Sequence, residues 1–258
     1  MPVRLAHTLI GDPRKPVLVL SGSLGTNRSM WKSQRALGDE WSLLLYDHRG
    51  HGASPAPPGP YTIDELGADV LLLLDALGVV SVHFCGLSLG GVVGLWLAAH
   101  HPARVERLVV MCALARLEQR RYAERAAAVR ADGIEPLAAG VVSRWFTPGY
   151  AQRHPAVVRG YRDALAGMPA EGYASCCDAI ASCDLRADIP GIEAPTLVLA
   201  GAEDPFVSPA SAATFAASLR EASVAVVPDA AHLINVEQPN LVNKLVRDHL
   251  VAGQGGPS

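Results

Sequence analysis

Short apolar runs alternate with longer amphipathic stretches along most of the chain. Each run is bounded by glycine, proline or a charged residue, which is typical of a buried strand. Six runs have this form: 16–22, 42–47, 79–85, 105–112, 195–201 and 223–228. Because they are apolar throughout rather than alternating, they indicate a mostly parallel sheet that is covered on both faces.

Helical patterns separate these strands. Thr62 is followed three residues later by Glu65, which predicts a capping box at the start of a helix that ends near Gly78. Further helices are predicted over 92–101 and 237–251. The regular alternation of strand and helix predicts a doubly wound α/β sheet.

One segment breaks the alternation. Between 115 and 186 the pattern is helical, and glycines and prolines divide it into short pieces. We therefore expect a core formed by 1–114 and 187–258, with 115–186 inserted between two strands as a helical cap, or lid. Such an insertion would lie over the carboxyl ends of the strands, where α/β sheets place their ligands.

Composition and charge narrow the range of partners. The 22 basic and 25 acidic residues are interspersed, so no basic stripe is available for nucleic acid. No apolar run is long enough to span a bilayer and no signal segment follows Met1, so we expect a cytoplasmic protein without a membrane partner.

The five cysteines have no metal-ligand spacing and are expected to be reduced, mostly buried thiols. The pattern does not determine the oligomeric state.

The strongest chemical signal is the pentapeptide Gly86-Leu-Ser-Leu-Gly90. It follows a predicted strand directly and precedes a helix, which is the context of a nucleophile elbow. Residues without a β-carbon at 86 and 90 let neighbouring chain pass close by, so that the Ser88 hydroxyl is exposed above the sheet. The alternative is a Gly-Ser turn without chemical meaning, which this placement disfavours.

A serine hydroxyl is a poor nucleophile until a base takes its proton. Of the nine histidines, His232 is the best placed, because it follows the last predicted strand. Asp204 follows the strand 195–201 and is the candidate acid that would orient the imidazole. The neighbouring Glu203 remains an alternative, although Pro205 pins the turn immediately after Asp204. Taken alone, His232 could equally be an ordinary loop histidine.

An oxyanion hole should complete this site. One donor is expected to be the backbone N–H of Leu89, and the other an N–H of the loop 21–25, which we assign to Ser23. A flexible glycine turn is the alternative for that loop.

Charged and imidazole side chains gather in the turn after the strand 42–47. A metal site at Asp47, His48 and His51 is conceivable, but neighbouring loop residues rarely point at one centre. Asp47 and Arg49 are expected instead to tie this turn together near the site.

These motifs resemble those of the α/β-hydrolase superfamily and, more narrowly, those of the 3-oxoadipate enol-lactonases. The similarity extends over nearly the whole chain, cap included. The matching segments are 21–26, 29–31, 46–52, 85–91, 144–148, 172–173, 176–180, 231–233 and 237–239. The chain departs from the pattern at Gly22, where many relatives have Asn, and at 112–117, which lacks the expected Asn-Thr-Ala.

The resemblance implies a function. It would be the hydrolysis of 3-oxoadipate enol-lactone to 3-oxoadipate through a serine acyl-enzyme, in the β-ketoadipate catabolism of aromatic compounds, with no metal or organic cofactor. Trp145 of the cap would be a wall of the substrate pocket or, equally, a cap-core aromatic. Another small-molecule lactonase or carboxylesterase, or a cofactor-free perhydrolase on the same triad, stays open, as does a ligand-binding sensor of this fold.

Overall fold

A seven-stranded sheet forms the centre of the protein. A computed structural model describes residues 1–252, and its strands lie in the order β1-β3-β2-β4-β5-β6-β7. β1 pairs antiparallel with β3, and all the other pairs are parallel. The strands are β1 (His7–Ile10), β2 (Val17–Ser21), β3 (Ser42–Tyr46), β4 (Val82–Leu87), β5 (Val105–Met111), β6 (Thr196–Gly201) and β7 (Ala222–Val227).

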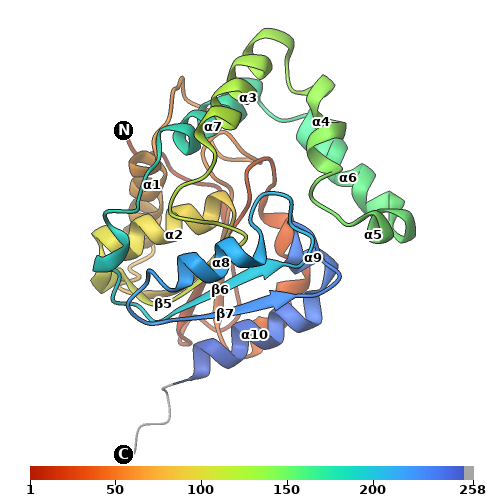
Figure 1. Ribbon diagram of the computed structural model, residues 1–258. Coiled ribbons are helices and arrows are strands. Elements are labelled where there is room, and N and C mark those ends of the chain that lie inside the picture. Colours follow the sequence, from red (N-terminus) through yellow and green to blue (C-terminus); the bar gives the residue numbers. More distant parts are fainter. Residues whose placement is uncertain (253–258) are drawn as a thin grey trace, which may run out of the picture.

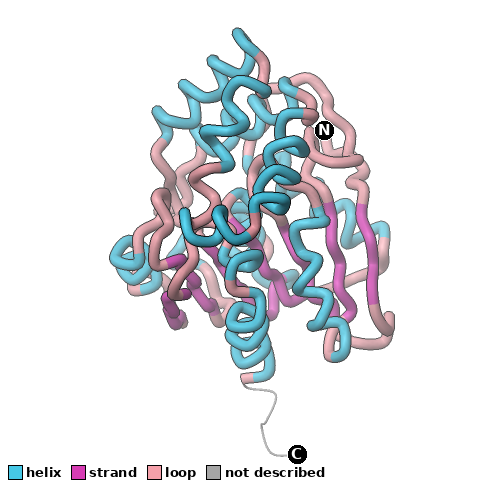
Figure 2. Tube along the Cα trace, turned by 90° about the vertical axis from the view of Figure 1, so that its right-hand side faces the viewer, coloured by secondary structure: helices cyan, strands magenta, loops and turns pink. Residues whose placement is uncertain are grey.

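Helices cover both faces of the sheet, as Figure 2 shows for the cyan helices around the magenta strands. α2 and α8 lie on the side toward the upper helices of Figure 1, and α10 lies on the opposite side, where it packs against η1. The helices outside the cap are η1 (Arg28–Asp39), α1 (Ile63–Ala76), α2 (Leu89–His100), η2 (Pro102–Arg104), η3 (Ile189–Gly191), α8 (Pro209–Ala216), α9 (Ile234–Glu237) and α10 (Pro239–Val251). In residues 1–252, none of the helices combines the length and apolar character that crossing a bilayer requires.

Five helices lie between β5 and β6, in the segment for which the sequence predicts helices alone. α3 packs on α7, and α4 packs on α6, so that two helix pairs form the upper part of Figure 1. Loops that follow the carboxyl ends of β2 and β3 meet these helices, since Gly25 lies against Trp145 and Gly50 against Gly172. The helices are α3 (Gln119–Asp132), α4 (Glu135–Val142), α5 (Pro148–Arg153), α6 (Pro155–Ala166) and α7 (Ala170–Ser182).

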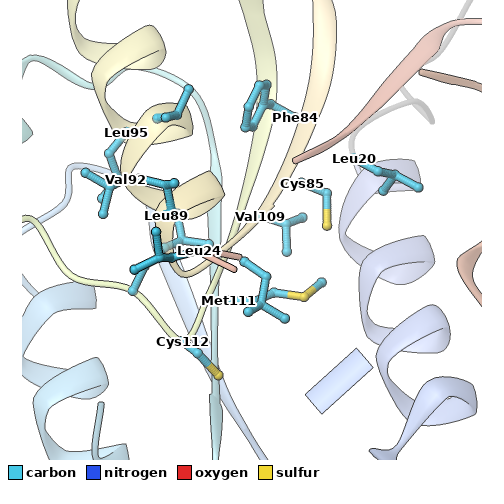
Figure 3. Packing of buried hydrophobic residues seen from close by; sticks show 14 of the residues in the cluster. Leu20, Leu24, Phe84, Cys85, Leu89, Val92, Leu95, Val109, Met111 and Cys112 are labelled. Carbon is cyan, nitrogen blue, oxygen red and sulfur yellow. The ribbon is translucent and has the colours of Figure 1, made fainter. Parts of the chain in front are cut away.

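The core is packed between the central strands and α2. Phe84 and Cys85 of β4, Val109 of β5 and Leu89 of α2 are all fully buried, and Figure 3 shows them in one cluster. α2 is apolar on nearly every side, which fits a helix enclosed by other elements. The five cysteines are free and buried, as predicted.

The predicted α/β class and all six strands are confirmed, and the Thr62–Glu65 capping box is present. Three boundaries are wrong. The strand predicted over 79–85 spans Val82–Leu87 instead. The helix predicted from residue 92 begins at Leu89, directly after the elbow, and the last long helix begins at Pro239 rather than 237. Proline lacks the N–H that would continue the preceding turn, so a new helix starts there.

Candidate active site

Ser88 lies at the turn between β4 and α2, with a backbone conformation of φ 56° and ψ −114°. Few residues other than glycine adopt a positive φ, and such positions persist only where the surroundings enforce them. A β-carbon at Gly86 would lie 2.2 Å from the carbonyl oxygen of Gly90, and one at Gly90 would lie 2.2 Å from that of Ser21. The Ser88 N–H donates to the carbonyl of Met111 on β5 at 2.8 Å. Close packing on both sides therefore holds the strained turn.

Asp204 and His232 form a buried pair. The distance from His232 Nδ1 to Asp204 Oδ2 is 3.0 Å, and the two side chains are 4% and 0% exposed. Burial alone would raise the pKa of Asp204, but the charge and hydrogen bond of His232 hold that pKa below its ordinary value. Asp204, rather than its exposed neighbour Glu203, is thus the carboxylate that contacts the imidazole.

The three predicted triad residues gather at the carboxyl ends of β4 and β6 and in the loop after β7. Ser88 is bonded to Met111, and the next residue, Cys112, has its sulfur within 4.8 Å of the ligand atoms of Asp204 and His232. In residues 1–252, Ser88 Oγ makes no hydrogen bond. A bond between the nucleophile and its base is often formed only in the substrate complex.

The loop that carries His232 is joined to the cap. The His232 N–H donates to the carbonyl oxygen of Trp145 at 3.2 Å. Glu237 Oε1 accepts the Ala231 N–H at 2.7 Å, and Oε2 accepts the N–H and hydroxyl of Thr147 at 3.0 and 2.8 Å. A single buried carboxylate therefore links the histidine loop to the start of α5. Sequence reasoning missed this role, because the partners lie 90 positions apart.

The start of α2 and the loop after β2 offer the main-chain donors expected for an oxyanion hole. Leu89 is the first residue of α2, so its N–H has no acceptor within that helix. The Ser23 N–H points at the thioether sulfur of Met30 at 3.4 Å, a weak acceptor that an oxyanion could displace. The neighbouring Leu24 N–H has no partner in the described part of the chain. Ser23 and Leu24 are thus two donors at the position where the sequence predicts one.

Two buried histidines hold the same loop from beneath. His51 Nε2 accepts the Gly25 N–H at 2.9 Å, and His48 Nε2 lies 3.0 Å from the carbonyl oxygen of Gly22, to which it donates. Burial lowers the pKa of His51 to about 4 and that of His48 to about 3, so both imidazoles are neutral at ordinary pH. The Nε2 atoms of both rings therefore bind main-chain groups of the loop after β2.

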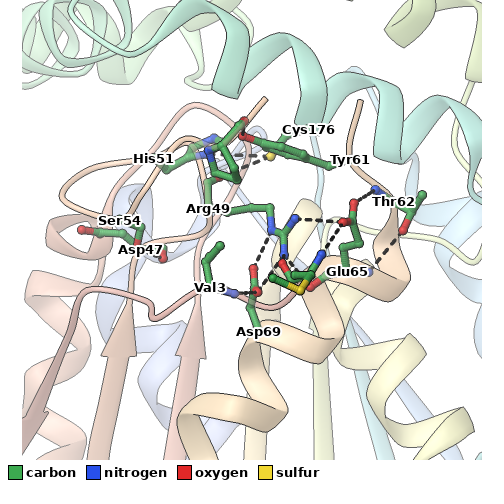
Figure 4. A network of polar contacts seen from close by, with 12 residues as sticks. Val3, Asp47, Arg49, His51, Ser54, Tyr61, Thr62, Glu65, Asp69 and Cys176 are labelled. Carbon is green, nitrogen blue, oxygen red and sulfur yellow. Dashed lines mark hydrogen bonds and ion pairs between the residues drawn. The ribbon is translucent and has the colours of Figure 1, made fainter. Parts of the chain in front are cut away.

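Asp47 and Arg49 fix the turn between these histidines, each through a different partner. Arg49 pairs with buried Asp69 of α1, with Nε 2.6 Å from Oδ2, and Asp69 also accepts the Val3 N–H (Figure 4). The Asp47 carboxylate pairs with Arg28 and accepts the Ala53 N–H at 3.0 Å. Asp47 and Arg49 therefore hold the turn through α1, the start of η1 and the Ala53 N–H of the turn itself.

Comparison with known proteins identifies the family. Residues 15–239 match the family model described as alpha/beta hydrolase fold. The chain belongs to this family. This α/β hydrolase is 42% identical to 3-oxoadipate enol-lactonase 2 of Acinetobacter baylyi, over 95% of its own length and 92% of the relative's. It is 37% identical to 3-oxoadipate enol-lactonase 1 of the same organism, over 91% and 88%. A solved enol-lactonase from Burkholderia xenovorans LB400 matches with a TM-score of 0.93, at 41% identity over 96% of each chain.

In this α/β hydrolase, one trio of residues in the described range has the spacing of metal ligands, namely Cys112, Asp204 and His232. Burial, and then the negative charge of Asp204, raise the pKa of the Cys112 thiol well above its ordinary value, so that Cys112 stays a thiol at neutral pH. Metals bind thiolates rather than thiols, and the other two members are already bonded to each other. Because Asp204 and His232 bind each other and Cys112 stays a thiol, the trio is poorly suited to binding a metal ion.

Trp145 lies between the cap and the loop after β2. Its side chain is buried, and a β-carbon at Gly25 would come within 3.2 Å of its indole ring. Beside it, a cavity of about 470 Å³ separates this loop from α5 and α6, with Met30, Tyr150 and Tyr161 in its walls. The resemblance gives Trp145 either as a wall of the substrate pocket or as an aromatic of the cap core. Its ring packs edge-on against Tyr161, and it is not among the residues that line this cavity.

Proposed function

We propose that this α/β hydrolase converts 3-oxoadipate enol-lactone to 3-oxoadipate. The observation that carries the proposal is that similarity to the two enol-lactonases covers more than 90% of the chain and therefore includes the cap. Triad residues recur throughout the superfamily, whereas the cap contacts the substrate in this proposal. The substrate is a small molecule, the chain acts in the cytoplasm, and the segment 115–186 serves as the cap.

Ser88 is the proposed nucleophile. His232 takes the hydroxyl proton through Nε2 as Oγ attacks the ring carbonyl, and Asp204 keeps the Nδ1–H in place and stabilises the imidazolium. The oxyanion is held by the N–H of Leu89 and by a second N–H from the loop after β2, at Ser23 or Leu24. Both donors come from backbone that packing fixes in advance.

The ring then opens to an acyl-enzyme. The leaving group is an enolate, which is far less basic than an alkoxide, so its departure requires little proton donation. The imidazolium gives its proton to the enolate, which becomes the ketone, and His232 is neutral again. His232 then takes a proton from water as the water oxygen attacks the acyl carbon. Collapse of this second intermediate breaks the bond to Ser88, the proton on His232 returns to Oγ, and 3-oxoadipate is released.

Replacement of the nucleophile tests the mechanism. Ser88→Ala should reduce kcat on the enol-lactone by several orders of magnitude, with only the contribution of binding and the oxyanion donors remaining. Thermal unfolding of the variant provides the control for folding. Near wild-type turnover of any ester or lactone by the folded variant would exclude Ser88 as the nucleophile.

A further inference from the structure

A second cavity lies between α3 and α4, the facing helices of the two cap pairs (Figure 1). Its volume is about 370 Å³, and apolar residues of α4 form part of its wall. Three arginines line it: Arg121 and Arg125 of α3, and Arg144 just beyond α4. The protein as a whole carries a formal charge of −3, so this concentration of positive charge is local.

The three guanidinium groups have no carboxylate partner. None of them forms a salt bridge within residues 1–252, although the structure contains many such pairs elsewhere. Glu124 also lines the cavity, but its carboxylate pairs with Arg120 at 2.7 Å. Burial and then the positive charges of Arg125 and Arg144 lower the pKa of Arg121. An anion in the cavity would relieve this repulsion.

The cluster also contacts both sides of the proposed active site. Arg121 Cζ lies 4.5 Å from the centre of the Phe206 ring, and that ring meets the His232 imidazole edge-on at 4.7 Å between centres. On the other side, Arg125 donates to the Tyr173 hydroxyl at 3.4 Å. The buried Tyr173 ring lies against the loop after β2, since a β-carbon at Gly25 would be 3.2 Å from it.

We propose that Arg121, Arg125 and Arg144 bind the free carboxylate of the lactone substrate. The inference rests on the proposed function and names the part of the cap that recognises the acid. Three bonds separate the carboxylate carbon from the ring oxygen of the ester, so the carboxylate lies roughly 5 Å from the ring carbonyl. The centres of the His232 and Phe206 rings are 4.7 Å apart, and Arg121 Cζ is 4.5 Å from the centre of the Phe206 ring. Arg121 Cζ is therefore less than 10 Å from the His232 ring, a separation that a lactone with its carbonyl at Ser88 and its carboxylate at Arg121 can span.

The cavity beside Trp145 suits a carboxylate less well. The 470 Å³ cavity beside Trp145 has Lys32 as its one charged side chain, and Lys32 is exposed to solvent. A guanidinium presents a planar fork of donors that matches a carboxylate, and it is more weakly hydrated than an ammonium group. Arg121 and Arg125 are half-buried, Arg144 is exposed, and none of the three pairs with a carboxylate in the described part of the chain, so the three together are the stronger site.

Substrate pairs test the proposal. The ratio of kcat/KM for the enol-lactone acid to that for its methyl ester is measured in wild-type protein, in Arg144→Gln and in Arg121→Gln/Arg144→Gln. The double variant should lower this ratio at least about tenfold, because a charge-assisted partner of the carboxylate is lost. Arg120→Gln, on the same helix but exposed and paired with Glu124, is the matched control and should leave the ratio unchanged. Equal ratios in wild-type protein and the folded double variant would overturn the proposal.

A second measurement separates this inference from the proposed function. Adipate, a dicarboxylate of similar size, is tested as a competitive inhibitor of phenyl acetate hydrolysis. If the enol-lactone is not a substrate but adipate inhibits wild-type protein, and its Ki rises at least about tenfold in Arg144→Gln, the proposed function fails and the anion site stands. The same Ki in both proteins would overturn the anion site.

Discussion

At the residue scale, Ser88 shows how local strain and packing produce a reactive group. A non-glycine residue with positive φ costs of the order of 1–3 kcal/mol, which neighbouring structure must offset. That support comes from β4 and α2, whose residues are almost completely buried. The sequence predicts this turn well, because the glycines, the strand and the helix that define it are contiguous in the chain.

The oxyanion loop is a second residue-scale feature, and a proline scan can test it. Proline removes one backbone N–H, so Ser23→Pro should cost roughly 10²–10³ in kcat if that N–H is the donor. Ser23→Ala keeps the N–H and should have a mild effect. The readout is kcat on one ester, measured on variants that unfold at temperatures near the wild-type value.

Leu24→Pro completes this comparison, because the Leu24 N–H has no hydrogen-bond partner among residues 1–252. A larger loss in Leu24→Pro than in Ser23→Pro would move the donor from position 23 to position 24. The sequence could not separate the two positions. The contact between the Ser23 N–H and Met30 depends on how η1 folds back on the loop, and no local pattern encodes it.

At the scale of elements, the sequence predicts the central strands because they are apolar on both faces. β1 has four residues with half-exposed alternation and lies at the edge of the sheet, so its pattern is too weak to stand out. η1 was not predicted either, because a 3-10 helix lacks the period of 3.6 residues on which helix prediction relies. Tertiary packing rather than local pattern therefore determines both elements.

Also at the scale of elements, Glu237 joins the loop that carries His232 to the cap. In Glu237→Gln, an NH₂ group replaces one carboxylate oxygen and faces an N–H donor at Ala231 or Thr147. Leaving such a buried donor unsatisfied costs about 1–3 kcal/mol, so the free energy of unfolding should fall by that amount. The measurement is chemical denaturation of the variant beside wild-type protein.

The same substitution should also reduce kcat, because the loop that carries His232 loses its anchor to the cap. Glu203→Gln is the matched control, since Glu203 is exposed and belongs to the loop that carries Asp204. Should Glu237→Gln match this control in both stability and kcat, the anchoring role would be refuted.

At the scale of the whole molecule, the buried neutral histidines make stability depend on pH. An imidazole in the unfolded chain has an ordinary pKa of 6.5, whereas burial lowers the pKa of His51 to about 4 in the folded state. Between these values the unfolded chain binds a proton that the folded protein excludes. The free energy of unfolding should therefore fall as the pH falls from 6.5 to 4, by up to about 1.4 kcal/mol per pH unit for this group. His48 acts in the same direction, down to about pH 3.

His51→Gln tests this dependence, because the glutamine oxygen can still accept the Gly25 N–H. Denaturation at a series of pH values should give a shallower slope between pH 4 and 6.5 for the variant than for wild-type protein. Above pH 7 the two slopes should coincide, since the imidazole is neutral in both states. Identical slopes below pH 6.5 would show that His51 does not titrate as described.

The specificity of the whole site tests the central claim most directly. The measurement is kcat/KM for 3-oxoadipate enol-lactone, for its methyl ester and for an unsubstituted enol-lactone, under identical conditions. A site built for the acid leaves its donors unpaired when the carboxylate is absent, so the acid should react faster by a factor on the order of 10² or more. Neutral lactones that react as well as the acid would contradict the account, and the protein would then be a general lactonase or esterase on the same triad.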